Sequence, residues 1–224
     1  MALILCLETT TTNCSVALAK DDEVIFLKED MGLNYSHAER LHIYLTDVLT
    51  QAGYDFKDLD AVAVSKGPGS YTGLRIGVSS AKGLCYALEI PLISTDTLKS
   101  MAMQVKDDVS YIVPMLDARR MEVYSAVFNS DFEKIRDTQA EILDEHSFID
   151  YLEKDKTAFI GNGVLKFKEL ASHKNAIYQP DALPSAREMA VMAYSKYKTG
   201  DFEDVAYFEP YYLKDFLVTK PKKV

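Results

Sequence analysis

The chain has 224 residues, and 48% of them are hydrophobic, which is enough for one large core or two smaller ones. Its 34 acidic and 25 basic side chains give a formal net charge of −9, which argues against a protein that binds nucleic acid by its own charge. The three cysteines, at positions 6, 14 and 85, fit neither a zinc site nor a disulfide framework, and no apolar run approaches a membrane span.

The first elements read as a meander of three strands. The apolar run Leu3–Leu7 predicts a buried strand, a polar turn rich in threonine follows over 8–13, and Ser15–Ala19 predicts the returning strand. A second turn, at Asp21 and Asp22, leads into a third strand over 23–28. A mixed sheet that begins antiparallel is therefore expected.

A helix is predicted next, over Ser36–Gly53. Leu41, Leu45 and Val48 recur at helical spacing and mark the face that would be buried. A short strand over 60–64 follows, and it leads into the most informative segment of the sequence.

That segment, Gly67–Gly77, reads Gly-Pro-Gly-Ser-Tyr-Thr-Gly-Leu-Arg-Ile-Gly. Gly67 and Gly69 allow backbone angles that a side chain forbids, and Ser70 or Thr72 can cap the helix that follows. Backbone N–H groups at such a helix start suit an anion. The segment lacks the Gly-Lys-Ser/Thr of a Walker loop, and its third glycine falls one position late for the dinucleotide fingerprint.

The helix after this turn carries a stripe of small residues. Gly73, Gly77 and Ala81 are four apart and therefore share one helix face. Such a stripe lets another backbone approach closely, and the residues alone leave two alternatives open. The stripe either packs on the chain's own sheet or meets a helix of a partner.

A strand over 91–93 and a helix from Thr97 to about Val105 complete the order β-β-β-α-β-α-β-α. The same order recurs more weakly after Ser110. Strands and helices are expected there over the ranges 111–116, 122–128, 138–143, 147–153, 158–160 and 185–198. The tail from Ala206 is rich in Tyr and Phe, which predicts that it docks on the protein up to about Val218.

The predicted class is therefore α/β, with two lobes that are each built on a mixed β-sheet. The lobes are expected to span 1–105 and 106–224. Whether the last segment packs back on the first lobe is open.

Four segments carry a resemblance to a known family. They are the strand and turn over 5–18, the glycine segment 67–77, the Asp117-Ala118-Arg119 turn with Glu122-Val123-Tyr124, and Glu209-Pro210-Tyr211-Tyr212-Leu213. Together they resemble the TsaB family, also called YeaZ. The resemblance runs over most of the chain and is densest before about residue 125.

The resemblance implies the fold of the actin, hsp70 and sugar-kinase ATPases, which is ribonuclease H-like. It implies a place in the bacterial cytoplasm, to which an odd number of reduced thiols is suited. Members help to make threonylcarbamoyladenosine on tRNA, at the adenosine 3′ of the anticodon. A catalytic paralogue, TsaD, transfers threonylcarbamoyl from threonylcarbamoyl-AMP, and a small ATPase, TsaE, completes the assembly.

By this resemblance the chain is an accessory subunit without catalytic activity of its own. It would form a heterodimer with the TsaD-like paralogue, pair with itself when alone, and reach tRNA only through the complex. The first helix and the small-residue helix match the pairing surface of the family. The expected partner-interface residues are Leu41, Gly73, Gly77, Ser80, Ala81 and Leu84.

The catalytic paralogue holds its metal through two histidines one helical turn apart, a spacing that puts both imidazoles on one face. In this chain Thr97 and Met101 stand at the matching positions, and neither replaces imidazole. His37 and His42 are five apart and are expected on a helix surface rather than at a metal. No metal site is predicted, and the glycoprotease-like metallopeptidase reading of the family finds no support.

Remnants of a nucleotide site are a further expectation from the resemblance. In related ATPases an acidic residue in the first turn orients hydrated Mg²⁺, and here that residue is Glu8, unless it and the threonines simply cap strands. The second phosphate turn, at Asp117, lacks glycine. The expected degenerate contacts are Glu8, Thr9, Thr10, Gly67, Gly69, Ser70, Asp117 and Arg119.

No cofactor is expected on this chain alone, whereas ATP or ADP with Mg²⁺ is an alternative at the interface of the complex. The rival to the accessory-subunit hypothesis is a stand-alone ATP hydrolase or kinase of the same fold.

Overall fold

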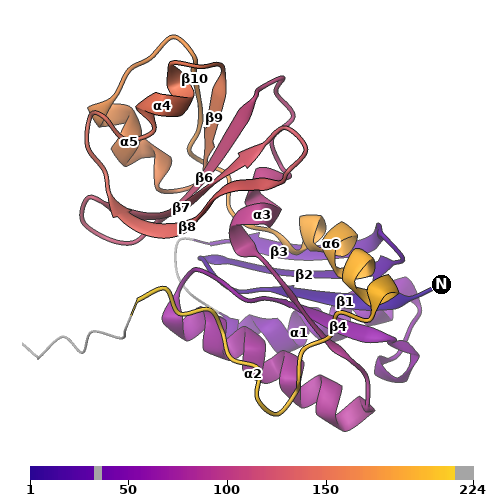
Figure 1. Ribbon diagram of the computed structural model, residues 1–224. Coiled ribbons are helices and arrows are strands. Elements are labelled where there is room, and N and C mark those ends of the chain that lie inside the picture. The colour runs from indigo at the N-terminus through magenta and orange to yellow at the C-terminus, as the bar shows by residue number, and fades with distance from the viewer. Residues whose placement is uncertain (33–36, 215–224) are drawn as a thin grey trace, which may run out of the picture.

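The computed structural model describes residues 1–32 and 37–214, which form two lobes that each contain a five-stranded sheet (Figure 1). The first sheet has the order β3 (Glu23–Met31), β2 (Asn13–Lys20), β1 (Leu3–Glu8), β4 (Ala61–Ser65) and β5 (Leu92–Thr95). β1 pairs antiparallel with β2, and β2 with β3, whereas β4 and β5 run parallel to β1. The predicted meander and mixed sheet are confirmed.

The first sheet is covered on both faces. Alternate residues of β1 point to opposite sides, so Leu5 lies in the core beneath α1 (His37–Ala52) and α2 (Tyr71–Leu88). Cys6 lies in the core beneath α6 (Ala186–Thr199) on the other face. This burial on both faces explains why β1 reads as a continuous apolar run.

The second sheet repeats this arrangement. Its order is β10 (Ala176–Gln179), β9 (Thr157–Ile160), β6 (Tyr111–Asp117), β7 (Glu122–Asn129) and β8 (Lys134–Ile142). One face packs against α3 (Thr97–Ala102), and the other against α4 (Ile149–Leu152) and α5 (Val164–Leu170). The predicted two-lobed α/β class is confirmed.

Three elements were missing from the sequence-based prediction: α5, β10 and the short 3₁₀ helix η1 (Phe56–Asp58). They are short, and the residues of β10 are only half-buried, so hydrophobic periodicity gives little signal. The predicted helix start at Ser36 and the predicted docking of the tail beyond Lys214 lie outside the described residues.

Two helices cross between the halves of the chain. α3 precedes residue 105 but packs on the second sheet, and α6 returns to cover the first sheet. Each sheet is thus completed by a helix from the other half. The division at residues 105 and 106 stays a prediction.

After α6 the chain crosses the first lobe as a segment outside helices and sheet strands, 203–214, which contains a turn at 205–207 and which we call the strap (Figure 1). It begins with an antiparallel bridge between Glu203 and Leu92 of β5, the edge strand of the first sheet. Val205 and Phe208 pack against the core beneath α2. The strap ends beside the second lobe.

Candidate functional site

Glu8 lies at the end of β1 and is fully buried. Its Oε1 accepts hydrogen bonds from the backbone N and the Oγ1 of Thr10, both at 2.6 Å, and its Oε2 accepts from Ser65 Oγ. Burial raises the pKa of this carboxyl above its usual value, against the effect of the hydrogen bonds. Glu8 therefore organises the first turn from below, and it does not line the cleft described next.

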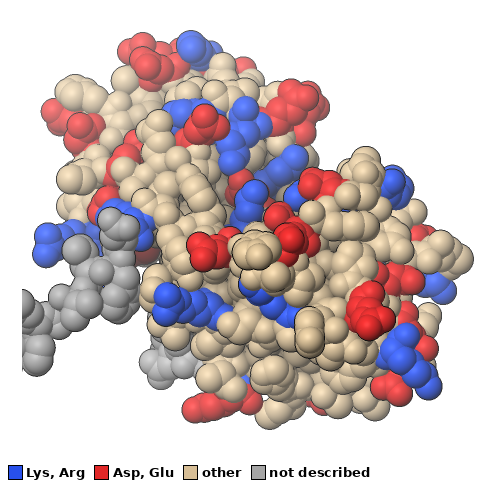
Figure 2. Space-filling model, turned by 60° about the horizontal axis from the view of Figure 1, so that its bottom comes forward, with Lys and Arg blue, Asp and Glu red and all other residues tan. Residues whose placement is uncertain are grey.

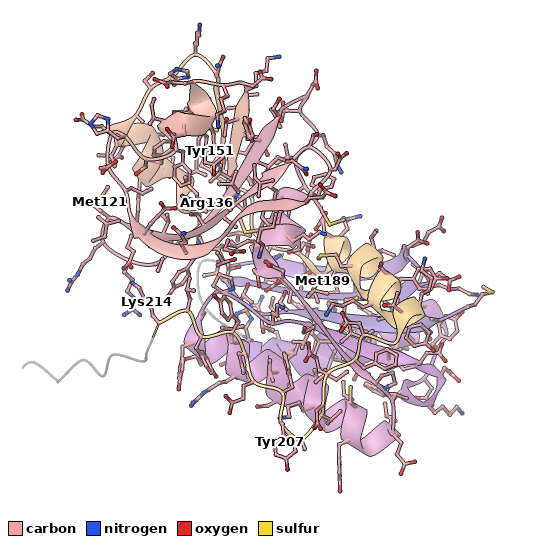
Figure 3. All side chains as sticks on the ribbon, viewed as in Figure 1. Met121, Arg136, Tyr151, Met189, Tyr207 and Lys214 are labelled. Carbon is pink, nitrogen blue, oxygen red and sulfur yellow. The ribbon has the colours of Figure 1, made fainter. Side chains whose placement is uncertain are left out.

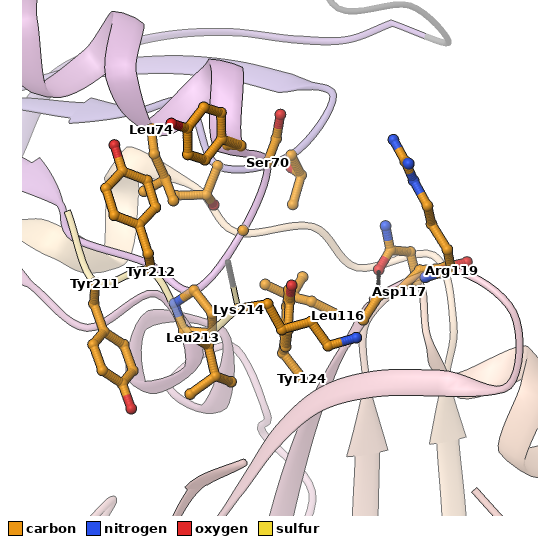
Figure 4. Close-up of a pocket in the computed structure, with 17 residues that line it drawn as sticks. Ser70, Leu74, Leu116, Asp117, Arg119, Tyr124, Tyr211, Tyr212, Leu213 and Lys214 are labelled. Carbon is orange, nitrogen blue, oxygen red and sulfur yellow. Dashed lines mark hydrogen bonds between the residues drawn. The ribbon is translucent and has the colours of Figure 1, made fainter. Parts of the chain in front are cut away.

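A cleft with a volume of about 280 Å³ lies between the lobes (Figure 4). The first lobe contributes Thr10, Gly69 and Ser70, and the second contributes Asp117 and Arg119. These five of the eight predicted nucleotide contacts therefore meet at one site. The other three, Glu8, Thr9 and Gly67, lie behind its wall.

The glycine turn of the first lobe is held from several sides. Gly67 has a φ of +111°, and its N–H donates to Thr97 Oγ1 at 3.2 Å. A Cβ at Gly69 would lie 2.5 Å from Thr10 Cβ, so this position needs glycine for space. Ser70 caps α2 by accepting from the backbone N of Gly73, as predicted.

The charged turn between β6 and β7 forms the opposite wall. Asp117 Oδ1 accepts from the backbone N of Arg119 and from Lys166 Nζ, each at 2.6 Å. Asn162 Oδ1 accepts from the backbone N of Asp117 at 2.9 Å, which ties the Gly161-Asn162-Gly163 turn to this wall (Figure 4). Asp117 is thus engaged as a turn residue and ion-pair partner.

Sequence reasoning missed part of the wall. Tyr124 and Asn162 from the second lobe line the cleft, and so do residues 211–214 at the end of the strap. The aromatic composition of the tail indicated docking, but nothing in it indicated the place. Residues 211–214 reach the cleft because the strap runs along α2.

The small-residue stripe requires a correction. A Cβ on Gly73 or Gly77 would come within 3.0 Å of Thr9, whose Oγ1 donates to the carbonyl of Gly73 at 2.8 Å. Ala81 and Leu41 are also fully buried in the chain's own core. The stripe therefore packs on the first turn of its own sheet, and these four residues do not form an outer surface.

The outer face of α1 and α2 is made by other residues. Ser80 and Leu84 of the predicted set are half-buried. Gly83 has nothing within 4 Å of an added Cβ, Tyr86 is 82% exposed, and Ile43 on α1 is 56% exposed. The prediction that these helices meet a partner stays a prediction, with its contact residues moved to this face.

The histidine prediction needs a second correction. His37 is buried, and its Nε2 lies 2.6 Å from the carbonyl oxygen of Thr11, so it is a core residue at the start of α1 rather than a surface residue. His42 is exposed, as predicted. Within residues 1–32 and 37–214 no group of three His, Cys, Asp or Glu side chains is placed to hold a metal. Cys6, Cys14 and Cys85 are buried free thiols.

Two sheets of the same strand order, with a glycine turn and a charged turn facing each other across a cleft, define the two-lobed class of actin, hsp70 and the sugar kinases. The family profile described as "TsaD: tRNA N6-adenosine threonylcarbamoyltransferase" matches residues 33–216. The chain is 31% identical to the tRNA threonylcarbamoyladenosine biosynthesis protein TsaB of Escherichia coli (strain K12), over 97% of this chain and 96% of that protein. The chain belongs to the TsaB family, also called YeaZ.

Two further comparisons agree with this membership. The protein of the same name from Haemophilus influenzae is 27% identical over 97% of this chain and 95% of its own length. The solved structure of YeaZ from Pseudomonas aeruginosa superposes with a TM-score of 0.82 at 25% identity, over 95% of this chain and 100% of that one. None of the described helices is long and apolar enough to cross a membrane.

Proposed function

We propose that this chain is a non-catalytic subunit required for making threonylcarbamoyladenosine in tRNA. It acts with a TsaD-like catalytic paralogue, which transfers threonylcarbamoyl from threonylcarbamoyl-AMP to the adenosine 3′ of the anticodon. The observation that carries the proposal is the similarity to Escherichia coli TsaB along 97% of the chain. The match of the TsaD profile over residues 33–216 supports a common origin of the two paralogues.

The residues at the positions of the paralogue's metal ligands support a non-catalytic role. Thr97 accepts a hydrogen bond from the backbone N of Gly67, and Met101 is buried in the core of the second lobe. Neither side chain is a ligand of the imidazole type. The two oxygens of Glu8 already accept hydrogen bonds from the protein, which weakens the rival hypothesis of a stand-alone ATP hydrolase or kinase.

The partner surface in this proposal is the outer face of α1 and α2. Gly83 permits close approach of a partner helix, and the exposed side chains of Ile43 on α1 and Tyr86 on α2 supply apolar area on the two helices. The same face would pair two copies of this chain when the paralogue is absent. A substitution at Gly77 does not test this surface, because an added side chain there meets Thr9.

The remaining members of the assembly are part of the proposal as well. A TsaE-like ATPase joins the pair in the cytoplasm, and tRNA is contacted through the complex. On the face shown in Figure 2, Lys and Arg lie interspersed with Asp and Glu, which supports an indirect role in tRNA binding. This chain alone binds no cofactor in the proposal, and the place for ATP or ADP with Mg²⁺ is the interface where the subunits meet.

The experiment that tests the function is nucleoside mass spectrometry on tRNA from cells depleted of this chain. Loss of threonylcarbamoyladenosine, restored by the wild-type gene, is expected. An unchanged level would show that the chain is dispensable for the modification and would refute the proposal.

Two matched variants then test the surface. Gly83→Arg places a long charged side chain on the outer face of α2, and Val191→Arg places one on the exposed side of α6, across the sheet. Gly83→Arg is expected to lose co-purification with the paralogue and to fail in complementation, whereas Val191→Arg is expected to behave as wild type. Normal pairing by a folded Gly83→Arg variant would refute the surface.

A further inference from the structure

The strap is held along the whole side of α2. The backbone N of Glu203 donates to the carbonyl of Leu92 at 2.8 Å, which pairs the strap with the edge strand β5 at one residue. Lys82 on α2 then donates from Nζ to two strap carbonyls, those of Ala206 at 3.1 Å and Phe208 at 3.0 Å. The strap is therefore a fixed part of the first lobe up to the glycine turn.

At the glycine turn the strap is anchored again. The backbone N of Tyr211 donates to the carbonyl of Lys66 at 2.7 Å, and the carbonyl oxygen of Tyr211 lies 3.0 Å from where a Cβ of Gly67 would be. The Tyr212 ring lies 5.0 Å from the Tyr71 ring, and Tyr212 Oη accepts from Arg75 Nε at 3.2 Å. These contacts direct the next residues, 213 and 214, towards the second lobe.

The last described residue reaches the second lobe. Lys214 Nζ forms an ion pair with Glu122 Oε2 at the start of β7, and it lies 5.9 Å from the centre of the Tyr124 ring. Figure 4 shows Lys214 beside Tyr124, and Figure 3 places Lys214 at the end of the strap next to the second lobe. One continuous segment thus bonds to both walls of the cleft.

We propose that the strap is an intramolecular latch: its anchor at Tyr212 and its tip at Lys214 hold the two lobes closed over the cleft. The chain passes between the lobes next to α3 and α6. The end of the strap lies away from these connections (Figure 1), so a tie there limits the rotation of the lobes about them. Residues 211–214 also form part of the lining of the cleft, so the latch occupies space that a ligand would need. The proposal does not depend on the pathway in which the protein acts.

Single-molecule energy transfer between the lobes tests the latch at concentrations where a single copy is observed. Dyes are placed on Gln51→Cys at the end of α1 and Glu153→Cys after α4, both at exposed positions. The native thiols are buried and have raised pKa values, about 12 for Cys6 and about 11 for Cys14 and Cys85, so they do not compete for the dye.

The latched chain is expected to give one narrow distribution of transfer efficiency. Lys214→Glu turns the ion pair with Glu122 into a repulsion, and it is expected to raise the population outside the narrow peak roughly three- to tenfold, the order set by an ion pair with a cation–π contact. Tyr212→Ala is expected to act in the same direction, because it removes the anchor behind the tip.

Rescue and matched controls separate a latch from general damage. The double variant Glu122→Lys with Lys214→Glu restores opposite charges and is expected to restore the narrow peak. Tyr207→Ala removes a strap side chain that is 84% exposed and points away from the cleft (Figure 3), and Lys174→Glu makes the same charge change on an exposed loop of the second lobe. Both are expected to match wild type.

Three results would overturn the proposal. The first is an unchanged distribution in folded Lys214→Glu and Tyr212→Ala variants. The second is a broad distribution in the wild-type chain, because the strap would then not restrain the lobes. The third is broadening by Lys214→Glu that the charge-swapped double variant does not reverse, because the effect would then not come from the pair with Glu122.

Discussion

Two glycines of α2, Gly73 and Gly83, allow a sharp test of which way the small-residue stripe of this helix faces. A Cβ on Gly73 would come within 3.0 Å of the backbone oxygen of Thr9, and a backbone atom cannot rotate away as a side chain can. A Cβ on Gly83, ten positions further along the same helix, meets nothing within 4 Å. Alanine should therefore have opposite effects at the two positions.

The magnitudes follow from this geometry. Overpacking costs about 1–3 kcal/mol, and the upper end applies at Gly73 because the obstacle is backbone. The strained hydrogen bond from Thr9 to the Gly73 carbonyl costs about 1 kcal/mol more, and the better helix propensity of alanine returns about 1 kcal/mol. Gly83→Ala gains only the propensity, so the free energies of unfolding of the two variants should differ by about 4 kcal/mol.

Urea unfolding followed by circular dichroism measures this difference. With a slope of about 2 kcal/mol per molar urea, the midpoints of Gly73→Ala and Gly83→Ala should lie about 2 M apart, on opposite sides of the wild-type value. Equal midpoints would refute the inward packing of the stripe. The stripe would then face outward, and Gly73→Ala would weaken pairing rather than folding.

Three further predictions concern buried groups. Burial raises the pKa of Glu8 above its ordinary 4.5, so the free energy of unfolding should fall as pH rises from about 4.5 through the folded pKa; urea titrations should show a flatter pH dependence for Glu8→Gln, and an equal slope would contradict the assignment. The thiols of Cys6, Cys14 and Cys85 should react with a disulfide reagent at pH 8 only after denaturation, so rapid reaction of the folded chain would show that they are accessible. Calorimetry of the isolated chain with ATP and Mg²⁺ should show no micromolar binding, because both oxygens of Glu8 are engaged; binding with turnover would favour the hydrolase alternative.

Local patterns were enough to predict most of the fold. The run Leu3–Leu7, the threonine-rich turn and the return strand placed β1 and β2, because a strand buried on both faces has no polar alternation. Ser70 could be named as a helix cap because it precedes a glycine-spaced helix. Short elements with half-buried residues, such as β10, lacked a pattern of this strength.

The predicted residues of the candidate site fall into two groups, those that line the cleft and those that lie behind it. Gly69, Ser70 and Asp117 were expected at a degenerate nucleotide site because of the family resemblance, and the structure places all three in the lining of one cleft. Glu8 was expected there as well, but its side chain points beneath the first turn to Ser65. Whether a turn residue faces the cleft or the core depends on which neighbour accepts or donates its hydrogen bonds, and that neighbour is far away in the sequence.

The sequence by itself determined the class of fold, the family and the presence of a close contact along the stripe of Gly73 and Gly77. Only the tertiary structure decided that this contact is with Thr9 of the same chain, that His37 is buried, and that the end of the strap bonds to both lobes. The physical reason is that spacing specifies which residues share a face of one helix or strand. It does not specify which distant segment covers that face, because the covering segment is chosen by the packing of the whole chain.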